Sequence, residues 1–495
     1  MDLTVLLFLT SGLFLGWSLG ANDAANVFGT AVGTRMVRFR TAAWVCAVFI
    51  LLGAVISGSG AAHTLGKLGS INALGGSFIA ALAAALTVYW LTRLSLPVST
   101  SQAIVGAIIG WNMFSNSITD PASLIKIMTT WFATPILAGL NAVPIFKLTN
   151  LVLHKSKVHL LRLDALTRVG LVFAGAFGAY ALGANNIANV MGVFVSVSPF
   201  TDISLGSMLT LTGIQQLFFI GAVAIAVGVF TYSKRVMMTV GGNLLQLSPV
   251  AAWVVVVSHS IVLFLFASEG LEYLLASNGL PTIPLVPVSS SQAVVGAVIG
   301  LGLMKGGKNI QWRVLGKISI GWVATPLISA AVCFIALFFM QNIFNQSVYR
   351  EVHFRLSPLV VDRFVEFGIS VEDFRDMDGK QYPSAVEFRK ELRDRTYLTR
   401  SQEDTVLKYA EVVGVTFDEK RLMLLSDDWL SREQVAAVFR LNGQSFSYKW
   451  RVAEALAAQS AEWVFKKSDL VNKSYNKLLK QKLNFVIREF EDKAG

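Results

Sequence analysis

Long apolar stretches recur along the first 349 residues, separated by short polar segments. The hydrocarbon core of a bilayer, about 30 Å thick, requires roughly 20 residues of helix to cross it. The stretches that meet this requirement are 3–31, 41–62, 71–92, 122–144, 168–194, 205–230, 249–268 and 318–345. Two shorter stretches, 101–113 and 291–304, each follow a proline and a run of hydroxyl residues. The pattern predicts an all-α integral membrane protein that crosses the bilayer many times.

The pattern changes after residue 349. Residues 1–349 hold 17 Lys/Arg and 7 Asp/Glu, whereas residues 350–495 hold 25 and 24. Helices are expected over 384–400, 450–465 and 470–490, and another from Ser426-Asp427-Asp428 to Gly443. We therefore predict a C-terminal α-helical soluble domain. It lacks a phosphate loop, metal cluster or catalytic constellation, so we expect no enzyme; regulatory, docking and structural roles all remain open.

Composition narrows the class of protein further. The chain is 54% hydrophobic and only 15% charged, whereas soluble domains are about a quarter charged. This excludes a disordered chain, collagen, a coiled coil and a soluble cytosolic enzyme. The net charge of +11 arises in membrane loops, so it does not indicate nucleic-acid binding. Cys46 and Cys333 lie within apolar runs and are expected in the core. The N-terminus lacks a basic segment and reads as a first membrane helix, not a cleaved signal peptide.

Three motifs occur twice, in the same order. GANDAANVFG at 20–29 matches GANNIANVMG at 183–192 in seven of ten positions. PVSTSQAIVGAIIG at 97–110 matches PVSSSQAVVGAVIG at 287–300 in eleven of fourteen, and WFATP at 131–135 matches WVATP at 322–326. The spacing between copies grows from 163 to 190 residues, which predicts an insertion in the second copy around 269–286. Interrupted apolar segments at corresponding places in two halves point to a transporter binding site.

Basic residues in short loops mark the cytoplasmic side of a membrane protein. They follow the first span, fill the segment between the two copies, and follow the second span of the second copy: Arg35, Arg38, Arg40; Lys147, Lys155, Lys157, Arg162, Arg168; Lys234, Arg235. Asp120, Asp202, Glu269 and Glu272 should then face outward. The first span runs from outside to inside and its copy runs the opposite way, which defines an inverted repeat.

The expected organisation is a membrane repeat at 1–145, a basic cytoplasmic connector at 146–167, a second membrane repeat at 168–345 and the soluble domain at 350–495. The inversion requires 101–113 to complete a crossing, and a re-entrant hairpin there is the alternative. The two readings place residues 350–495 on opposite sides of the membrane.

One acidic residue, Asp23, lies well inside a predicted span. A lone carboxylate in the membrane is costly and by default marks an ion or proton pathway; capping a helix break is the structural alternative. Asn22 and Asn26 add amide oxygens, which with a carboxylate suit a hard cation such as Na⁺. Because the second copy has Asn186 in place of the acid, one acidic cation or proton site is more plausible than two.

The PVSTSQ and PVSSSQ segments predict helices that begin inside the membrane. Pro97 and Pro287 disfavour helix just before them, and the hydroxyl residues that follow are of the types that cap helix N-termini. Such a start presents free N–H groups to an anion, and the amides of Gln102 and Gln292 would add donors. The candidate anion-binding residues are Ser99, Thr100, Ser101, Gln102, Ser289, Ser290, Ser291 and Gln292. No Lys or Arg lies in either motif, as suits a ligand that must be released.

Together, the duplicated motifs closely resemble the inorganic phosphate transporter family over about residues 1–345. The resemblance implies a secondary active symporter that imports inorganic phosphate with Na⁺ or H⁺, built from inverted repeats with broken helices or re-entrant hairpins. It implies a multi-pass protein of the plasma or inner membrane, often a homodimer, with no cofactor besides the coupling ion. It implies cation- or proton-coupling contacts at Asn22, Asp23, Asn26, Asn185, Asn186 and Asn189, and phosphate contacts at both hydroxyl runs.

This chain departs from the family pattern at two kinds of position. Many members carry His where Gln102 and Gln292 stand, and many carry Asp where Asn186 stands. The first departure argues against a histidine proton relay and the second against a second cation site. Transport of another oxyanion such as sulfate is one alternative function, and a membrane-anchored sensor or scaffold working through its C-terminal domain is another. Since protonated phosphate can donate a hydrogen bond to Asp23 and sulfate cannot, phosphate is the expected substrate.

Overall fold

The computed structural model forms two compact units. The membrane unit comprises Met1–Ser115, Thr119–Phe200 and Leu211–Tyr349. The C-terminal unit comprises Arg350–Gly495 together with the short segments Asn116–Ile118 and Thr201–Thr210. The structure describes residues 3–69, 71–94, 98–156, 158–200, 202–205, 209–243, 247–307, 310–370, 374, 377, 379–423, 425, 430–467 and 472–492.

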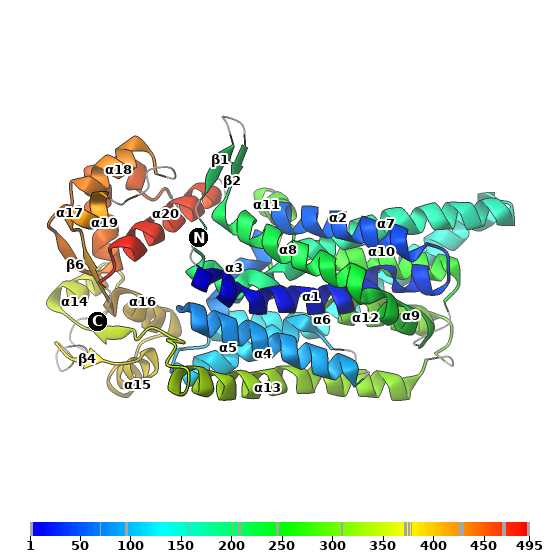
Figure 1. Cartoon of the computed structure of the whole chain (residues 1–495), viewed down its shortest axis with the longest axis horizontal. Helices are drawn as coiled ribbons and strands as arrows, with labels where there is room; N and C mark the ends of the chain where they lie inside the picture. Colours follow the sequence, from blue (N-terminus) through cyan, green and yellow to red (C-terminus); the bar gives the residue numbers. More distant parts are fainter. Residues whose placement is uncertain are drawn as a thin grey trace. The chain divides into compact units, whose positions relative to one another are not determined.

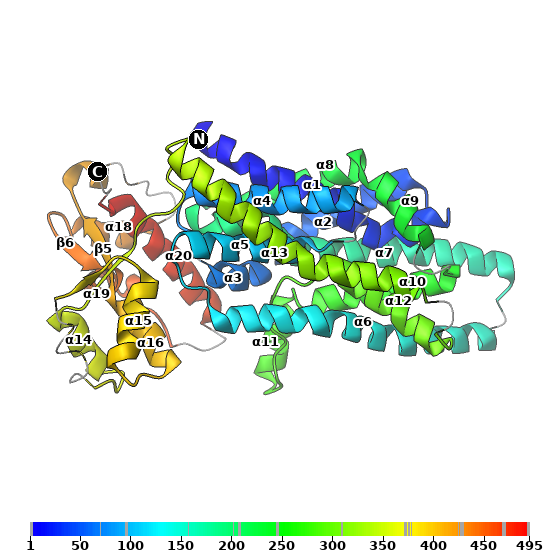
Figure 2. The same ribbon diagram turned by 90° about the horizontal axis from the view of Figure 1, so that it is seen from below.

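Helices build the membrane unit in two successive sets, and the long helices of both sets run roughly along one direction (Figures 1 and 2). The first set is α1 (Leu3–Gly33), α2 (Phe39–Ser57), α3 (Ser59–Leu68), α4 (Leu74–Arg93), α5 (Thr100–Phe114) and α6 (Pro121–Ser156). The second is α7 (Leu160–Met191), α8 (Gly213–Thr231), α9 (Ser233–Asn243), α10 (Pro249–Leu265), α11 (Glu269–Ser277), α12 (Ser290–Met304) and α13 (Trp312–Asn342). Within the described residues, seven helices are long and apolar enough to span a membrane, or eight counting α10 and α11, which meet at 67°.

These helices coincide with the stretches expected from the sequence, with a few differences at their ends. The expected span 205–230 begins only at Gly213, because Thr212 and Gln215 form a capping box there. Two short strands, β1 (Ile203–Leu205) and β2 (Leu209–Leu211), precede it. The expected 41–62 span ends at Ser57, after which α3 begins. The predicted connector at 146–167 is mostly helical, because α6 continues to Ser156 and α7 begins at Leu160. A helix that already spans the membrane can extend into water with polar side chains.

The two sets pack on each other in matched pairs. Helix α1 packs on α8 as α7 packs on α2, and α5 packs on α13 as α12 packs on α6. Glycines allow these contacts, because a Cβ at Gly106 of α5 would overlap the Pro326 carbonyl of α13, and one at Gly296 of α12 would overlap the Pro135 carbonyl of α6. The repeated sequence motifs thus correspond to a two-fold-related packing arrangement, as an inverted repeat requires.

Contacts at the helix ends define two faces of the membrane unit. At one face, Nη1 of Arg168 donates to the Arg35 and Met36 carbonyls at 3.3 and 2.9 Å, so α1 ends where α7 begins. At the other, the rings of Phe8 and Phe78 lie 5.6 Å apart. The segment that follows α13 lies at that second face, where the Val348 carbonyl packs against Gly76 of α4.

These faces decide between a crossing and a hairpin at 101–113. Helix α4 begins beside Phe8 and ends at Arg93, while α5 ends with the Phe114 ring 6.2 Å from that of Tyr349. Arg93 and Phe114 therefore lie at opposite faces of the membrane unit, which favours a crossing over a hairpin at 101–113. The chain leaves the membrane unit at the face opposite Arg35.

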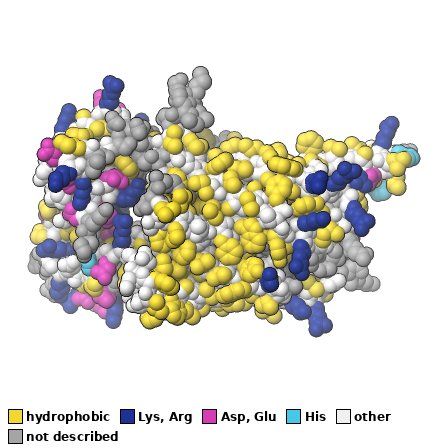
Figure 3. Space-filling model, in the orientation of Figure 1, with side chains coloured by type: hydrophobic (Ala, Val, Ile, Leu, Met, Phe, Trp, Pro, Cys, Tyr) yellow, Lys and Arg dark blue, Asp and Glu magenta, His cyan; other side chains and the backbone are white. Residues whose placement is uncertain are grey.

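Side-chain type follows the expected membrane pattern. Hydrophobic side chains cover the helices on the visible side of the membrane unit, and Lys and Arg gather at the end where α6 and α7 join (Figure 3). Cys46 and Cys333 are buried and free, which confirms their expected place in the core.

The C-terminal unit combines helices with a four-stranded antiparallel sheet of order β4-β3-β5-β6, which the expectation of an α-helical domain did not include. Its elements are β3 (His353–Arg355), α14 (Pro358–Val365), β4 (Gln381–Tyr382), α15 (Ala385–Arg395), α16 (Arg400–Ala410), β5 (Glu411–Thr416), α17 (Glu419–Met423), α18 (Arg432–Phe439), β6 (Ser445–Tyr448), α19 (Lys449–Gln459), a 3-10 turn at Ala461–Trp463 and α20 (Lys473–Phe490). Strand β5 alternates partly buried and buried residues, the pattern of a half-buried strand.

The helices expected in this unit are present with shifted ends. Helix α18 begins after Ser431, whose hydroxyl accepts from the backbone N–H of Gln434 in a capping box, and not at Ser426-Asp427-Asp428, which lie outside the described residues. Phe354 and Tyr382 face each other across β3 and β4 and belong to one core cluster; Val415 of β5 and Phe490 of α20 belong to a second.

Candidate substrate and cation site

The duplicated motifs meet inside the membrane unit. Asn22, Asp23 and Asn26 lie on α1, and their counterparts lie on α7. The hydroxyl runs form the starts of α5 and α12. Twelve of the fourteen candidate residues are buried, the exceptions being the partly buried Asn22 and Asn26. The buried set is Asp23, Ser99, Thr100, Ser101, Gln102, Asn185, Asn186, Asn189, Ser289, Ser290, Ser291 and Gln292.

Both short helices begin with a serine cap, as the sequence predicts. Ser99 and Ser289 have extended backbone, and their hydroxyls accept from the backbone N–H of Gln102 at 3.4 Å and of Gln292 at 3.3 Å. The first N–H groups of a helix have no partner within it. Each start therefore presents donors and a positive dipole end inside the protein. Pro287 precedes α12 as expected, while Pro97 lies outside the described residues.

The segments that lead into α5 and α12 lie side by side. The Ser101 hydroxyl donates to the Val288 carbonyl at 3.0 Å, and the Ser291 hydroxyl donates to the Val98 carbonyl at 3.3 Å. The two bonds are equivalent under the repeat, because each pairs a serine of one copy with a valine of the other. The pseudo-two-fold axis therefore passes between the two helix starts.

Asparagines on α1 and α7 hold the opposite repeat's helix start. The Asn26 amide donates to the Ser290 hydroxyl at 3.1 Å, and the Asn189 amide donates to the Ser101 hydroxyl at 2.8 Å. Asn185 binds backbone instead: its amide donates to the Val286 carbonyl at 3.1 Å, and its oxygen accepts from the Val288 N–H at 2.8 Å. Asn185 thus holds the segment before α12 in place.

The site is chemically asymmetric at Asp23. This carboxylate accepts from the Asn22 amide at 2.9 Å. The Thr100 hydroxyl lies beside it without a hydrogen bond of regular geometry. The counterpart Asn186 oxygen accepts from the Asn189 amide at 2.8 Å and lies 3.4 Å from the Ser101 hydroxyl oxygen. In the described part of the membrane unit, Asp23 is the one buried acid, so negative charge is confined to one half of the site.

Several buried polar atoms around the helix starts have no hydrogen-bond partner within the protein. They are the Thr100 Oγ1, Gln102 Oε1, Asn186 Nδ2, Asn189 Oδ1, His259 Nδ1 and Gln292 Oε1 atoms. An unsatisfied buried polar group costs about 1–3 kcal/mol, and such groups are uncommon in native proteins. Five of these atoms belong to motif residues on α5, α7 and α12 and the sixth to His259 on α10, and this concentration fits a site that binds a polar ligand.

His259, which the sequence analysis did not single out, also belongs to this cluster. It lies on α10, fully buried, with Nε2 2.9 Å from the Ser290 hydroxyl. The available signal was a histidine within the apolar run VVVVSHSIVLFL. No repeated motif contains it, and a lone histidine in an apolar helix is more often a core residue.

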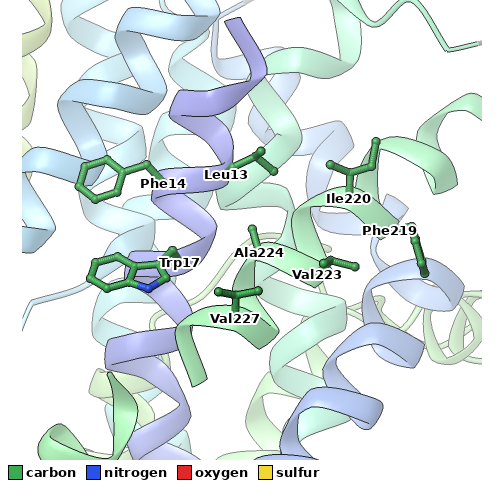
Figure 4. A pocket seen from close by; sticks show the side chains of 8 residues that line it. All are labelled: Leu13, Phe14, Trp17, Phe219, Ile220, Val223, Ala224 and Val227. Carbon is green, nitrogen blue, oxygen red and sulfur yellow. The ribbon is translucent and has the colours of Figure 1, made fainter. Parts of the chain in front are cut away.

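A separate groove lies between α1 and α8 and is lined by apolar side chains, among them Leu13, Trp17, Val223 and Val227 (Figure 4). The Trp17 indole N–H donates to the Thr231 hydroxyl at 2.9 Å, so its one polar group is already engaged. The groove offers no donors to an anion and no oxygen ligands to a cation. The ligand-binding chemistry therefore lies at the helix starts.

Known proteins are similar to this chain in sequence and in fold. The profile of the phosphate transporter family matches residues 19–273 and 275–426. A Methanocaldococcus jannaschii protein named "Putative phosphate permease" is 27% identical, and the alignment covers 68% of this chain and 97% of that protein. The Bacillus subtilis protein named "Sulfate permease" is 26% identical over 73% of this chain and 93% of its own length.

A solved structure titled "The sodium-dependent phosphate transporter" has the same fold, with a TM-score of 0.52, 24% identity, and coverage of 68% of this chain and 100% of that chain. The profile match extends beyond residue 345, where the motif resemblance ended, to residue 426. The paired helix starts, the asparagine motifs and the profile match lead to one conclusion: the chain is a multi-pass membrane protein that belongs to the phosphate transporter family.

Proposed function

We propose that this protein imports inorganic phosphate by symport with Na⁺, through the site formed by α1, α7 and the starts of α5 and α12. The observation that carries the proposal is the pairing of two anion-facing helix starts with a single buried carboxylate, Asp23. The family match supports transport of an oxyanion.

The anion would bind between the two helix starts. Backbone N–H groups, serine and threonine hydroxyls and the glutamine amides all donate hydrogen bonds, and oxyanions accept them. Near pH 7 phosphate always carries at least one proton. That proton would donate to Asp23, which therefore favours phosphate over an anion that has no proton to give.

The cation would bind at Asp23 with the amide oxygens of Asn22 and Asn26. Hard cations prefer oxygen ligands of this kind. We propose Na⁺ and not H⁺ as the coupling ion, because the solved structure with this fold is titled as sodium-dependent. Since Asn186 stands where the second acid would be, we propose one charged cation site and not two.

We infer the orientation of the chain in the membrane from the distribution of basic residues. Arg35, Arg93, Arg168 and Lys305 lie at the face where α1 ends and α7 begins, whereas Lys67 and Lys126 lie toward the other. By the positive-inside rule the first face is cytoplasmic. The residues that follow Tyr349 would then emerge on the extracytoplasmic side.

Sulfate transport is the second candidate. The relative from Bacillus subtilis is named a sulfate permease, and Gln102 and Gln292 replace residues that are histidine in many phosphate transporters. Asp23 argues for phosphate, because a carboxylate repels an unprotonated dianion unless a cation lies between them.

Reconstituted transport separates these functions. The full-length protein in proteoliposomes should accumulate labelled phosphate against its gradient when Na⁺ is higher outside. Replacing Na⁺ by choline should abolish this accumulation, and an inward proton gradient imposed without Na⁺ should not restore it. Accumulation of sulfate in place of phosphate would favour the second candidate. Uptake of neither anion would favour a sensor or scaffold that works through residues 350–495.

A further inference from the structure

His259 lies outside every repeated motif, yet it contacts a residue of the proposed binding site. Its side chain is fully buried in α10, and its Nε2 lies 2.9 Å from the Ser290 hydroxyl oxygen. The same oxygen accepts from the Asn26 amide at 3.1 Å. The other ring nitrogen, Nδ1, has no hydrogen-bond partner.

The hydrogen-bonding capacity of Ser290 limits what this arrangement can do. A serine hydroxyl has one hydrogen to donate and two lone pairs to accept with. The Asn26 amide can only donate, so it occupies one lone pair. The bond to His259 then occupies either the second lone pair or the hydroxyl hydrogen.

The unpartnered Nδ1 decides between these two directions. A buried imidazole without an ionic partner is neutral and carries one N–H. A hydrogen on Nδ1 would leave a buried donor unused, which is rare in proteins. A hydrogen on Nε2 has an acceptor, because it donates to the Ser290 hydroxyl oxygen. The Ser290 oxygen then accepts twice, and its hydrogen must point toward a third partner.

We propose that His259 is a positioning residue for anion binding: it donates to Ser290 and so fixes that hydroxyl as a donor to the bound oxyanion. This inference rests on the function proposed above. The equivalent residue of the first repeat, Thr100, has no comparable pair of donors, since its Oγ1 accepts no hydrogen bond and its hydroxyl lies beside the Asp23 carboxylate. The two halves of the site therefore differ in what they offer the anion.

This difference orients an anion that has both bare and protonated oxygens. The second repeat presents a fixed donor at Ser290, which suits a bare oxygen. The first repeat presents the Asp23 carboxylate, which suits a protonated oxygen. Asp23 and Asn26, which holds Ser290, lie about one turn apart on α1. A singly or doubly ionised phosphate meets both requirements, whereas sulfate meets only the first.

Two substitutions at His259 test the proposal in full-length protein reconstituted in proteoliposomes. His259→Phe keeps a ring but removes both nitrogens, and should raise the phosphate KM about tenfold, the loss of one hydrogen bond to a charged group. His259→Gln places an amide nitrogen near the position of Nε2, and should keep the KM within about threefold of wild type. Ser260→Ala is the matched control, because Ser260 adjoins His259 and its hydroxyl donates to its own helix at Val256.

A double-mutant cycle with Ser290→Ala distinguishes positioning from a general role in packing. If His259 acts through Ser290, His259→Phe should change the KM less than about twofold in the Ser290→Ala background. Elution volume and melting temperature identify variants that fold. Should His259→Phe not fold, His259→Met replaces it as the variant without a ring nitrogen.

Three results would overturn the proposal: an unchanged KM in folded His259→Phe, equal impairment of the Phe and Gln variants, or additive effects of His259→Phe and Ser290→Ala. Failure of the proposed function gives a different result. A wild type that transports sulfate and not phosphate would overturn phosphate import, and the same variants measured with sulfate would still decide the role of His259. A wild type that transports neither anion would overturn both.

Discussion

Asp23 and Asn186 occupy equivalent places in the two repeats, yet one is an acid and the other an amide. Asp23 accepts from Asn22, whereas the Asn186 oxygen accepts from Asn189 and lies beside the Ser101 hydroxyl. A second buried carboxylate in the same site would add like-charge repulsion to the cost of desolvation. A single acid next to many hydrogen-bond donors allows one cation and one anion to neutralise each other within the site.

The equivalent hydroxyls Thr100 and Ser290 should both contribute to phosphate binding. We expect Thr100→Val and Ser290→Ala each to raise the phosphate KM about tenfold or more, since a hydrogen bond to a charged group contributes about 1.5–3 kcal/mol. Initial rates of phosphate uptake in proteoliposomes measure this. Thr87→Val, which removes a buried hydroxyl bonded to its own helix at Ala83, should leave the KM unchanged. An effect at only one of the two positions would argue against a shared two-sided site.

Asp23 should also determine which oxyanions compete for the site. Arsenate has the shape and protonation of phosphate, so it should inhibit phosphate uptake at similar concentrations. Sulfate brings no proton and leaves the carboxylate unpaired, which costs about 1–3 kcal/mol and corresponds to roughly ten- to hundredfold weaker inhibition. Inhibition curves for the two anions, measured against labelled phosphate, provide the comparison. Equal potency would show that Asp23 does not distinguish protonated from unprotonated anions.

At the scale of elements, backbone-to-backbone packing fixes where the short helices begin. Gly106 and Gly110 of α5 lie against the carbonyls of Pro326 and Ala330, and Gly296 and Gly300 of α12 lie against their counterparts on α6. These contacts hold α5 and α12 along their length, while their first turns face the site. Without this support the unpaired N–H groups would not stay directed at a ligand.

Adding one methyl group at these glycines should disturb both stability and transport. Gly106→Ala and Gly296→Ala each place a Cβ against a backbone carbonyl that has little room to move, and overpacking of this kind costs about 1–3 kcal/mol. We expect a lower melting temperature in detergent and reduced uptake. Gly316→Ala in α13 meets nothing within 4 Å and should keep or raise the melting temperature. Wild-type stability in both packed variants would contradict the close packing described here.

Much of this arrangement could be predicted from the sequence. Apolar length predicted the spans, the proline and hydroxyl runs predicted the starts of α5 and α12, and the lone acid identified Asp23. His259 was missed because one polar residue in an apolar helix carries no periodic or repeated signal. The strands of the C-terminal unit were missed because they are two to six residues long, and they are stabilised by pairing with distant segments. Contacts such as Ser101 with Val288 also join residues too far apart in sequence for local patterns to reveal.

At the scale of the whole molecule, the inverted repeat places equivalent helix starts on either side of one pseudo-two-fold axis. The reciprocal bonds of Ser101 with Val288 and of Ser291 with Val98 tie the two repeats together at that axis. A site built at such an interface can open to one side or the other as the repeats move against each other. The two repeats are thus equivalent in backbone arrangement but differ in charge, since Asp23 of the first corresponds to Asn186 of the second.

The faces of the membrane unit predict the orientation of the chain. Tyr349 lies opposite the basic face that contains Arg35, so residues beyond it should be extracytoplasmic. An impermeant maleimide applied to intact cells should label Tyr397→Cys, since Tyr397 is fully exposed, and should not label Lys155→Cys until the cells are opened. Both native cysteines are buried. The reverse labelling pattern would show that the orientation is inverted.

The most direct test of the account is cation-driven phosphate accumulation by Asp23→Asn. The substitution keeps the side chain's size and removes the one buried acid in the described part of the membrane unit, so the cation should lose its main ligand. We predict that this variant elutes and melts like wild type but no longer concentrates phosphate under a Na⁺ gradient. Asp164→Asn, which removes an exposed acid paired with Arg168 on α7, should accumulate phosphate normally. Undiminished Na⁺-driven accumulation by Asp23→Asn would contradict the central claim that Asp23 couples the cation to phosphate.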